Sequence, residues 1–223
     1  MPRKKEILRV KGKIKETYTM FSRFYGFLEE KFEKGLRKRA LAHLVLQKGE
    51  TALEIGFGTG CALEQMAEVV GQTGRIYGID ITPRMVELAR KRLRRKGLSG
   101  RAELTEGDAR DMPYPDNQFD AVLMASVLEL FDTPEIPVVL KEVKRVLKPE
   151  GRLVVASIPK EGFEDSKVLT LYEWLHQKFP KHASCRPIYL EDSLKYTGYR
   201  ITKAEVLLLA KIFPMKIVSA KTS

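Results

Sequence analysis

Short apolar segments alternate with helical segments through the middle of the chain, and this alternation limits the possible folds more than any other feature. Residues 51–55 and 75–80 are short apolar runs, and each precedes a stretch with apolar residues at helical spacing. The run at 119–128 is too continuously apolar for a strand with one exposed face. Strands and helices in this order form a parallel sheet that helices cover on both faces.

The same pattern predicts how the sheet ends. Five strands are expected in the alternating region, at 51–55, 75–80, 102–108, 119–128 and 152–158. Pro149 and Gly151 are predicted to end the helix before the last of them. Residues 200–222 then indicate two strands joined at Phe213-Pro214. We therefore expect an α/β fold with a doubly wound, mostly parallel seven-stranded sheet and an antiparallel C-terminal hairpin.

Three glycines at alternate positions separate the first predicted strand from the helix that follows it. Gly56, Gly58 and Gly60 have no Cβ, allow positive φ, and let backbone N–H groups face a ligand. The helix N-terminus after them adds a partial positive charge. Because ligands of doubly wound sheets lie at the carboxyl ends of the strands, this turn predicts a ligand held against the main chain.

Carboxylates near this turn indicate which ligand it is. The glycine spacing is one residue shorter than the dinucleotide pattern, and Glu54 suits a cationic amino group better than a pyrophosphate. Asp80 ends the second strand, where a ribose-binding carboxylate belongs. Asp108 follows the third strand and is placed to accept a hydrogen bond from an adenine amino group. Together they describe a nucleoside with a positively charged amino-acid tail and no phosphate.

Four segments, "LEIGFGTG", "YGID", "EGDARDMPYPDNQFDAV" and "VLKPEGRLVVAS", resemble in order and spacing the class I S-adenosylmethionine-dependent methyltransferases, over roughly residues 45–160. "MPYPDNQFD", with "YTMFSRFYGFLEEKFEKGLRKRAL" before the core, resembles the branch of the ubiquinone/menaquinone C-methyltransferases (methyltransferase domain 11/25 type). The resemblance implies a Rossmann-like fold, S-adenosyl-L-methionine as cofactor and S-adenosyl-L-homocysteine as product.

The resemblance also implies which residues hold the cofactor. Glu54 and the backbone of residues 56–58 would hold the methionine moiety, and Asp80 the ribose. Tyr18 and Tyr25 match aromatic positions that close over the cofactor, with ordinary helix packing as the alternative. The implied cofactor-binding residues are Glu54, Gly56, Phe57, Gly58, Asp80, Ile81, Asp108, Ala109, Ala125, Tyr18 and Tyr25.

The expected reaction is in-line displacement of the methyl group onto a small-molecule or lipid/quinone-like acceptor, driven mainly by orientation. No catalytic residue is assigned: His176 and His182 are each either a base or a surface residue, and Arg186 is a candidate to bind an anionic acceptor. Two cysteines and three histidines at unrelated spacings predict no metal site.

The basic N-terminus leaves the partner open. Residues 1–40 hold 13 Lys/Arg and 5 Asp/Glu, so they carry +8 of the net charge of +11. We expect a basic N-terminal helical cap over 1–45 and a methyltransferase domain over 46–223, with acceptor-side helices in 160–200. A basic cap of this kind can contact RNA or an anionic membrane surface, or it can simply be a solvated face. The alternatives are thus an RNA-directed methyltransferase and a non-catalytic cofactor-binding partner subunit.

Composition also bears on location. No apolar run approaches the ~18 residues that cross a bilayer, and the N-terminus lacks the apolar stretch of a signal peptide. We expect a cytoplasmic protein with free thiols that can bind at the membrane surface, and leave the oligomeric state open. A single asparagine beside 40 Lys/Arg and 29 Asp/Glu is typical of a thermophile.

Overall fold

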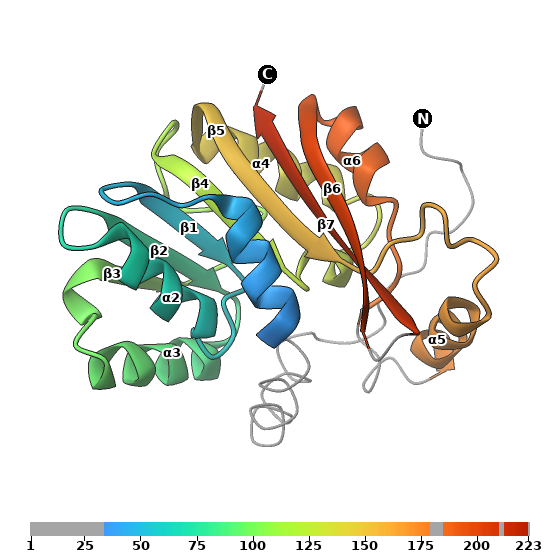
Figure 1. Ribbon diagram of the computed structural model, residues 1–223, viewed down its shortest axis with the longest axis horizontal. Coiled ribbons are helices and arrows are strands. Elements are labelled where there is room, and N and C mark those ends of the chain that lie inside the picture. The colour runs from blue at the N-terminus through green and yellow to red at the C-terminus, as the bar shows by residue number, and fades with distance from the viewer. Residues whose placement is uncertain (1–33, 179–184, 210–211, 223) are drawn as a thin grey trace.

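One seven-stranded sheet forms the centre of the molecule (Figure 1), a computed structural model that describes residues 34–178, 185–209 and 212–222. The strand order is β3-β2-β1-β4-β5-β7-β6. The first five strands pair in parallel, and β7 runs antiparallel to both β5 and β6. The predicted doubly wound, mostly parallel sheet with a C-terminal hairpin is confirmed. The strands are β1 (Thr51–Ile55), β2 (Arg75–Asp80), β3 (Ala102–Glu106), β4 (Phe119–Ala125), β5 (Leu147–Ser157), β6 (Tyr199–Leu209) and β7 (Phe213–Thr222).

Helices cover both faces of the sheet because successive strand residues point to opposite sides. On β1, Ala52 belongs to one buried apolar cluster and Leu53 to the other. The helix over 34–44, together with α2 and α3, packs in the first cluster, and α4 and α6 pack in the second. No helix of the described residues is long and apolar enough to span a bilayer. The helices are α2 (Cys61–Val70), α3 (Pro83–Arg95), α4 (Ile136–Val146), α5 (Lys167–Lys178) and α6 (Leu190–Tyr196), with short 3-10 turns η1 (Ser99–Arg101) and η2 (Leu128–Leu130).

Two predicted boundaries are wrong. The helix before β5 ends at Val146, so Pro149 and Gly151 lie inside the strand and do not end the helix. The reason is an irregular start to β5: its ladder with β4 shifts register, and the extra residues loop out with Glu150 at a φ of 58°. The hairpin turn likewise precedes Phe213, which already belongs to β7.

Candidate active site

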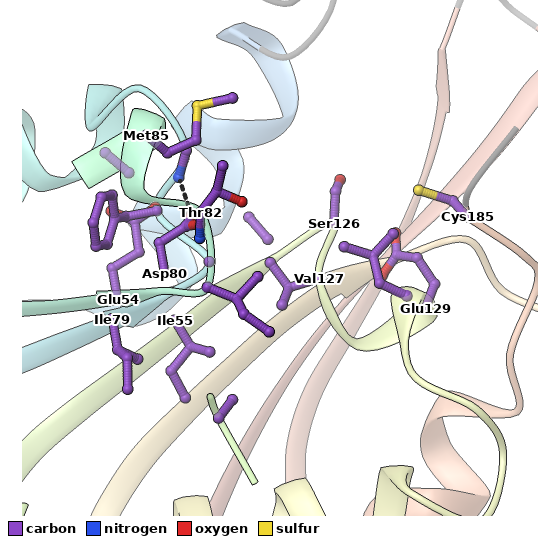
Figure 2. A pocket seen from close by; sticks show the side chains of 18 of the residues that line it. Glu54, Ile55, Ile79, Asp80, Thr82, Met85, Ser126, Val127, Glu129 and Cys185 are labelled. Atoms are coloured by element: carbon purple, nitrogen blue, oxygen red, sulfur yellow. Dashed lines mark hydrogen bonds between the residues drawn. The ribbon is translucent and has the colours of Figure 1, made fainter. Parts of the chain in front are cut away.

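A cavity of about 360 Å³ opens at the carboxyl ends of the parallel strands (Figure 2). The turns after β1, β2, β3 and β4 line one side, and residues from α5 and the β6–β7 hairpin line the other. The chain order reverses between β1 and its neighbour β4, so the cavity lies at the switch point where such sheets bind ligands. Its volume suits a small organic ligand.

The glycine turn after β1 is closely packed against its neighbours. Gly56, Gly58 and Gly60 have φ values of 65°, 52° and 79°. A Cβ at Gly56 would come within 2.4 Å of the Val127 side chain, which follows β4. The turn therefore has no room for side chains at the point where the ligand would approach it.

The backbone N–H groups of these glycines do not face the cavity, so that expectation is wrong. Gly56 N donates to the Ile79 carbonyl at 2.7 Å, and Gly58 N donates to an Asp80 carboxylate oxygen at 3.0 Å. Gly60 N donates to the Phe57 carbonyl at 2.9 Å. These N–H groups hold the turn in place, because buried N–H groups need partners. The glycines therefore allow a ligand to approach the main chain closely but do not donate hydrogen bonds to it.

Asp80 joins the two turns that frame the cavity. One carboxylate oxygen accepts from Gly58 N at 3.0 Å, and the other accepts from Thr82 N at 2.8 Å, ahead of α3. The Thr82 side chain also hydrogen-bonds the carboxylate, which keeps capacity for one further hydrogen bond. Burial raises the pKa of Asp80, and the hydrogen bonds from Thr82 and Gly58 oppose that rise. The neighbouring Ile81 exposes 38% of its surface and lines the same wall.

Glu54 is a second buried carboxylate on this wall. It lies near the end of β1, between Gly78 of β2 and Leu123 of β4, and only 5% of its surface is exposed. Figure 2 shows Glu54 on the same side of the cavity as Asp80 and Thr82. Two buried carboxylates give this wall a negative potential that favours a cationic group.

Asp108 binds a residue of its own loop. The Arg110 side chain bonds both Asp108 oxygens and also pairs with Glu135 before α4. The Arg110 hydrogen bond holds the pKa of Asp108 below its ordinary value, with burial opposing. This network fixes the loop after β3, and the buried Ala109 beside it lines the cavity.

The cavity brings together every predicted cofactor-binding residue within the described part of the chain. These are Glu54, Gly56, Phe57, Gly58, Asp80, Ile81, Asp108, Ala109 and Ala125. Tyr18 and Tyr25 lie outside the described residues, as does His182. His176 is buried in α5 and does not line the cavity, so the surface alternative for it is wrong. In the described residues, no group of three or more His, Cys, Asp or Glu could hold a metal ion.

Sequence reasoning missed the opposite wall. Glu129 of η2 has no exposed surface and lines the cavity, and Figure 2 shows it with Cys185 away from Glu54 and Asp80. Its signal was a carboxylate within the apolar run "VLELF". Tyr172 of α5 and Phe213 of β7 also line this wall, but no local pattern links two residues so far apart. The predicted candidate Arg186 donates to the Phe131 carbonyl at 2.7 Å and does not line the cavity.

Comparison with known proteins supports one family. A methyltransferase domain model matches residues 52–151. The chain is 36% identical, over 77% of its own length and 68% of the relative's, to a demethylmenaquinone methyltransferase of Lactobacillus johnsonii. It is 34% identical, over 67% of its length and 59% of the relative's, to the ubiquinone/menaquinone biosynthesis C-methyltransferase UbiE of Ectopseudomonas mendocina.

A solved structure has the same fold. A SAM-dependent methyltransferase from Aquifex aeolicus superposes with a TM-score of 0.68 at 23% identity, covering 92% of this chain and 98% of that one. The sheet order, the position of the cavity and the relatives agree with one another. The chain belongs to the class I S-adenosylmethionine-dependent methyltransferases, in the branch that contains the demethylmenaquinone and ubiquinone/menaquinone C-methyltransferases.

Proposed function

We propose that this methyltransferase methylates an apolar, quinone-like or lipid-like acceptor. The observation that carries the proposal is the division of the cavity into two unlike walls. Glu54, Asp80 and Asp108 make one wall polar, whereas the other wall contains Tyr172, Phe213 and further apolar side chains, Ile158 and Met215. An apolar acceptor gains free energy by leaving water for such a wall. Relatives named for demethylmenaquinone are consistent with this acceptor class.

We assign S-adenosylmethionine to the polar wall, where three features fit it. Glu54 is buried and suits the ammonium group of the amino-acid tail, and Gly56 lines the cavity with no side chain over its main chain. Asp80 keeps an acceptor position for a ribose hydroxyl, beside the exposed apolar Ile81 for the adenine ring. The adenine edge would meet Ala109, since Arg110 already binds both Asp108 oxygens.

The role of the protein in the reaction is chiefly to position the two reactants. Bound S-adenosylmethionine supplies a methyl group that its sulfonium has already activated, and S-adenosylhomocysteine is the product. The wall that contains Tyr172 and Phe213, which we call the acceptor wall, would align the nucleophile with that methyl group and exclude water. Alignment and exclusion of water are large sources of acceleration. Ala125, at the end of β4, lines the cavity and would contact the methionine end of the cofactor.

Calorimetric titration with S-adenosylmethionine, S-adenosylhomocysteine and NAD in parallel tests the cofactor assignment. We expect micromolar binding of the first two and none of NAD. Transfer of a labelled methyl group to a reduced naphthoquinone with an isoprenoid tail, compared with tRNA, then tests the acceptor. Labelling of tRNA alone would overturn the proposed acceptor and leave the cofactor site intact.

We also propose that the basic cap over 1–45 contacts an anionic membrane surface in a protein that works in the cytoplasm. The +8 charge of residues 1–40, most of them outside the described part, supports this role. The RNA-directed alternative is not favoured, because the relatives are named for quinones. Vesicle and tRNA binding measured against salt would separate the two, since phosphate contacts weaken steeply as salt rises.

A further inference from the structure

Exposed apolar side chains gather on two elements of the acceptor side. Among the described residues, eleven large hydrophobic side chains are exposed, and six of them lie on α5 and the β6–β7 hairpin. Four of these six lie on α5 or at the hairpin tip beside it, and we call them the α5–hairpin surface: Val168, Leu171, Trp174 and Ile212. The most exposed of the four are Ile212 at 65% and Leu171 at 58%. Apolar side chains gathered in this way mark an interaction site more often than chance exposure.

The two elements lie side by side. Figure 1 shows α5 next to the tip of the β6–β7 hairpin, away from the glycine turn. The rings of Tyr172 and Phe213 meet edge to face, with centroids 5.3 Å apart. Val168, Leu171 and Trp174 follow one another three residues apart along α5, which is helical spacing for one side of a helix. The exposed Val206 and Leu208 of β6 are not part of this surface, because Leu207 between them points to the sheet face on which Tyr172 and Phe213 pack.

This surface adjoins the acceptor wall of the cavity. Tyr172 and Phe213 line that wall, and their chain neighbours Leu171 and Ile212 are exposed on the surface. The same two elements therefore present apolar groups both to the cavity and to the outside. An apolar molecule that passes between α5 and the hairpin would contact apolar side chains on both elements.

Charge around the α5–hairpin surface favours an anionic partner. Residues 160–223 contain eleven Lys/Arg and seven Asp/Glu. Lys167 and Lys178 are exposed at the two ends of α5. The acidic residues on these two elements are paired, Glu173 with Lys160 and Glu205 with both Arg39 and His43. An apolar face flanked by lysines, with a half-exposed tryptophan, suits the interface of an anionic bilayer.

We propose that the α5–hairpin surface docks on an anionic lipid bilayer, so that the acceptor wall opens toward the lipid. The proposal rests on the proposed function, in that a lipid-like acceptor would enter the cavity from the leaflet without crossing water. It assigns the bilayer contact to folded elements at the cavity mouth, in addition to the basic cap.

Trp174 allows a direct test because it is the only tryptophan in the chain. With the full-length protein, we expect vesicles of phosphatidylglycerol and phosphatidylcholine to shift Trp174 emission to the blue and to shield the indole from aqueous iodide. Brominated lipids in the same vesicles should quench it. Vesicles of phosphatidylcholine alone should bind more weakly, since they lack the anionic charge.

Matched variants locate the contact. Leu171→Ser combined with Ile212→Ser should weaken vesicle binding at least tenfold. The control combines Val69→Ser of α2 with Val138→Ser of α4, which are 49% and 48% exposed on other elements, and should leave vesicle binding unchanged. All variants should keep the S-adenosylmethionine affinity of the parent, because none of these side chains lines the cavity.

Three results would overturn the proposal. Vesicle binding without a change at Trp174 would place the contact elsewhere. An indole shielded from iodide before lipid is added would mean that another part of the chain covers the surface. A concentration-dependent dimer that the Leu171/Ile212 variant abolishes would assign the surface to a second copy. Failure to bind S-adenosylmethionine with normal vesicle binding would instead contradict the proposed function alone.

Discussion

The two walls of the active site are built in different ways. The polar wall, to which we assign the cofactor and which we call the cofactor wall, consists of turns. Their residues are close in sequence, such as Asp80 and Thr82, or follow adjacent strands, such as Gly58 and Asp80. The acceptor side depends on residues that are distant in the chain, such as Tyr172 with Phe213. A turn with little freedom leaves a recognisable sequence pattern. Side chains brought together across the fold leave none.

The largest effect we expect is from Gly56→Ala. A Cβ there combines an unfavourable positive φ, costing about 1–2 kcal/mol, with overlap on Val127, costing about 1–3 kcal/mol. Denaturant unfolding should show the summed loss, and calorimetry should show lost S-adenosylmethionine binding. Gly97→Ala is the control, because Gly97 has a similar φ of 67° in open space and should lose only the first contribution. Equal losses in both variants would show that close packing at Gly56 is unimportant.

The second effect concerns the loop between β3 and β4. Arg145 of α4 donates to the Met112 and Tyr114 carbonyls at 3.1 and 2.7 Å and bonds the Glu142 side chain. Arg145→Ala removes several charge-assisted bonds, and we expect a loss of about 2–3 kcal/mol in unfolding free energy. Arg145→Lys should recover only part, because a lysine cannot reproduce the fork of donors. An unchanged midpoint in urea would contradict this role.

The Arg145–Glu142 pair should also make the free energy of unfolding depend on pH. The Arg145 hydrogen bond holds the pKa of Glu142 below its ordinary value of 4.5, with burial opposing. A carboxyl whose pKa is lowered by folding adds stability above its unfolded pKa and loses it as pH falls through the folded value. Unfolding free energy measured below pH 5 should therefore fall less steeply in Arg145→Ala than in the parent. Parallel curves would show that the pair does not contribute.

Asp80→Asn tests the cofactor wall more gently. The amide keeps an oxygen for one of the backbone N–H groups but loses the charge and one acceptor position. We expect a 10- to 100-fold weaker affinity for S-adenosylmethionine, or about 1.4–2.8 kcal/mol, with the fold retained. Asp80→Ala should abolish measurable binding with the fold retained. Parent-like affinity in both variants would remove the ribose assignment.

Glu129→Gln should give the smallest effect and sharpen the contrast between the walls. Glu129 is fully buried and lines the acceptor wall, so we expect it to help position the acceptor. Turnover should fall about tenfold, equivalent to about 1.4 kcal/mol, while S-adenosylmethionine affinity stays unchanged. The nearby Cys185→Ser is the control for a polar change on the same wall. Weakened cofactor binding in Glu129→Gln would show that the two walls are not independent.

The sequence by itself determined the sheet and the cofactor wall. Periodicity located the strands, and the glycines with Glu54 and Asp80 predicted both the position and the chemistry of the cavity. These features are local, since a turn without side chains and a carboxylate at a strand end can each be recognised within a few residues. The direction of the glycine N–H groups was wrong, because Gly56 N and Gly58 N find their partners in Ile79 and Asp80 of another strand.

Only the tertiary structure decided the acceptor wall and the α5–hairpin surface. Phe213 and Tyr172 meet because β7 inserts between β5 and β6 and carries the hairpin tip beside α5. Pro149 and Gly151 likewise lie within β5 because Leu147 and Arg152 on either side of them pair with β4. The helix propensities of most residues differ by about 1 kcal/mol or less. Several contacts between distant segments together therefore outweigh the local preference of a residue for one secondary structure.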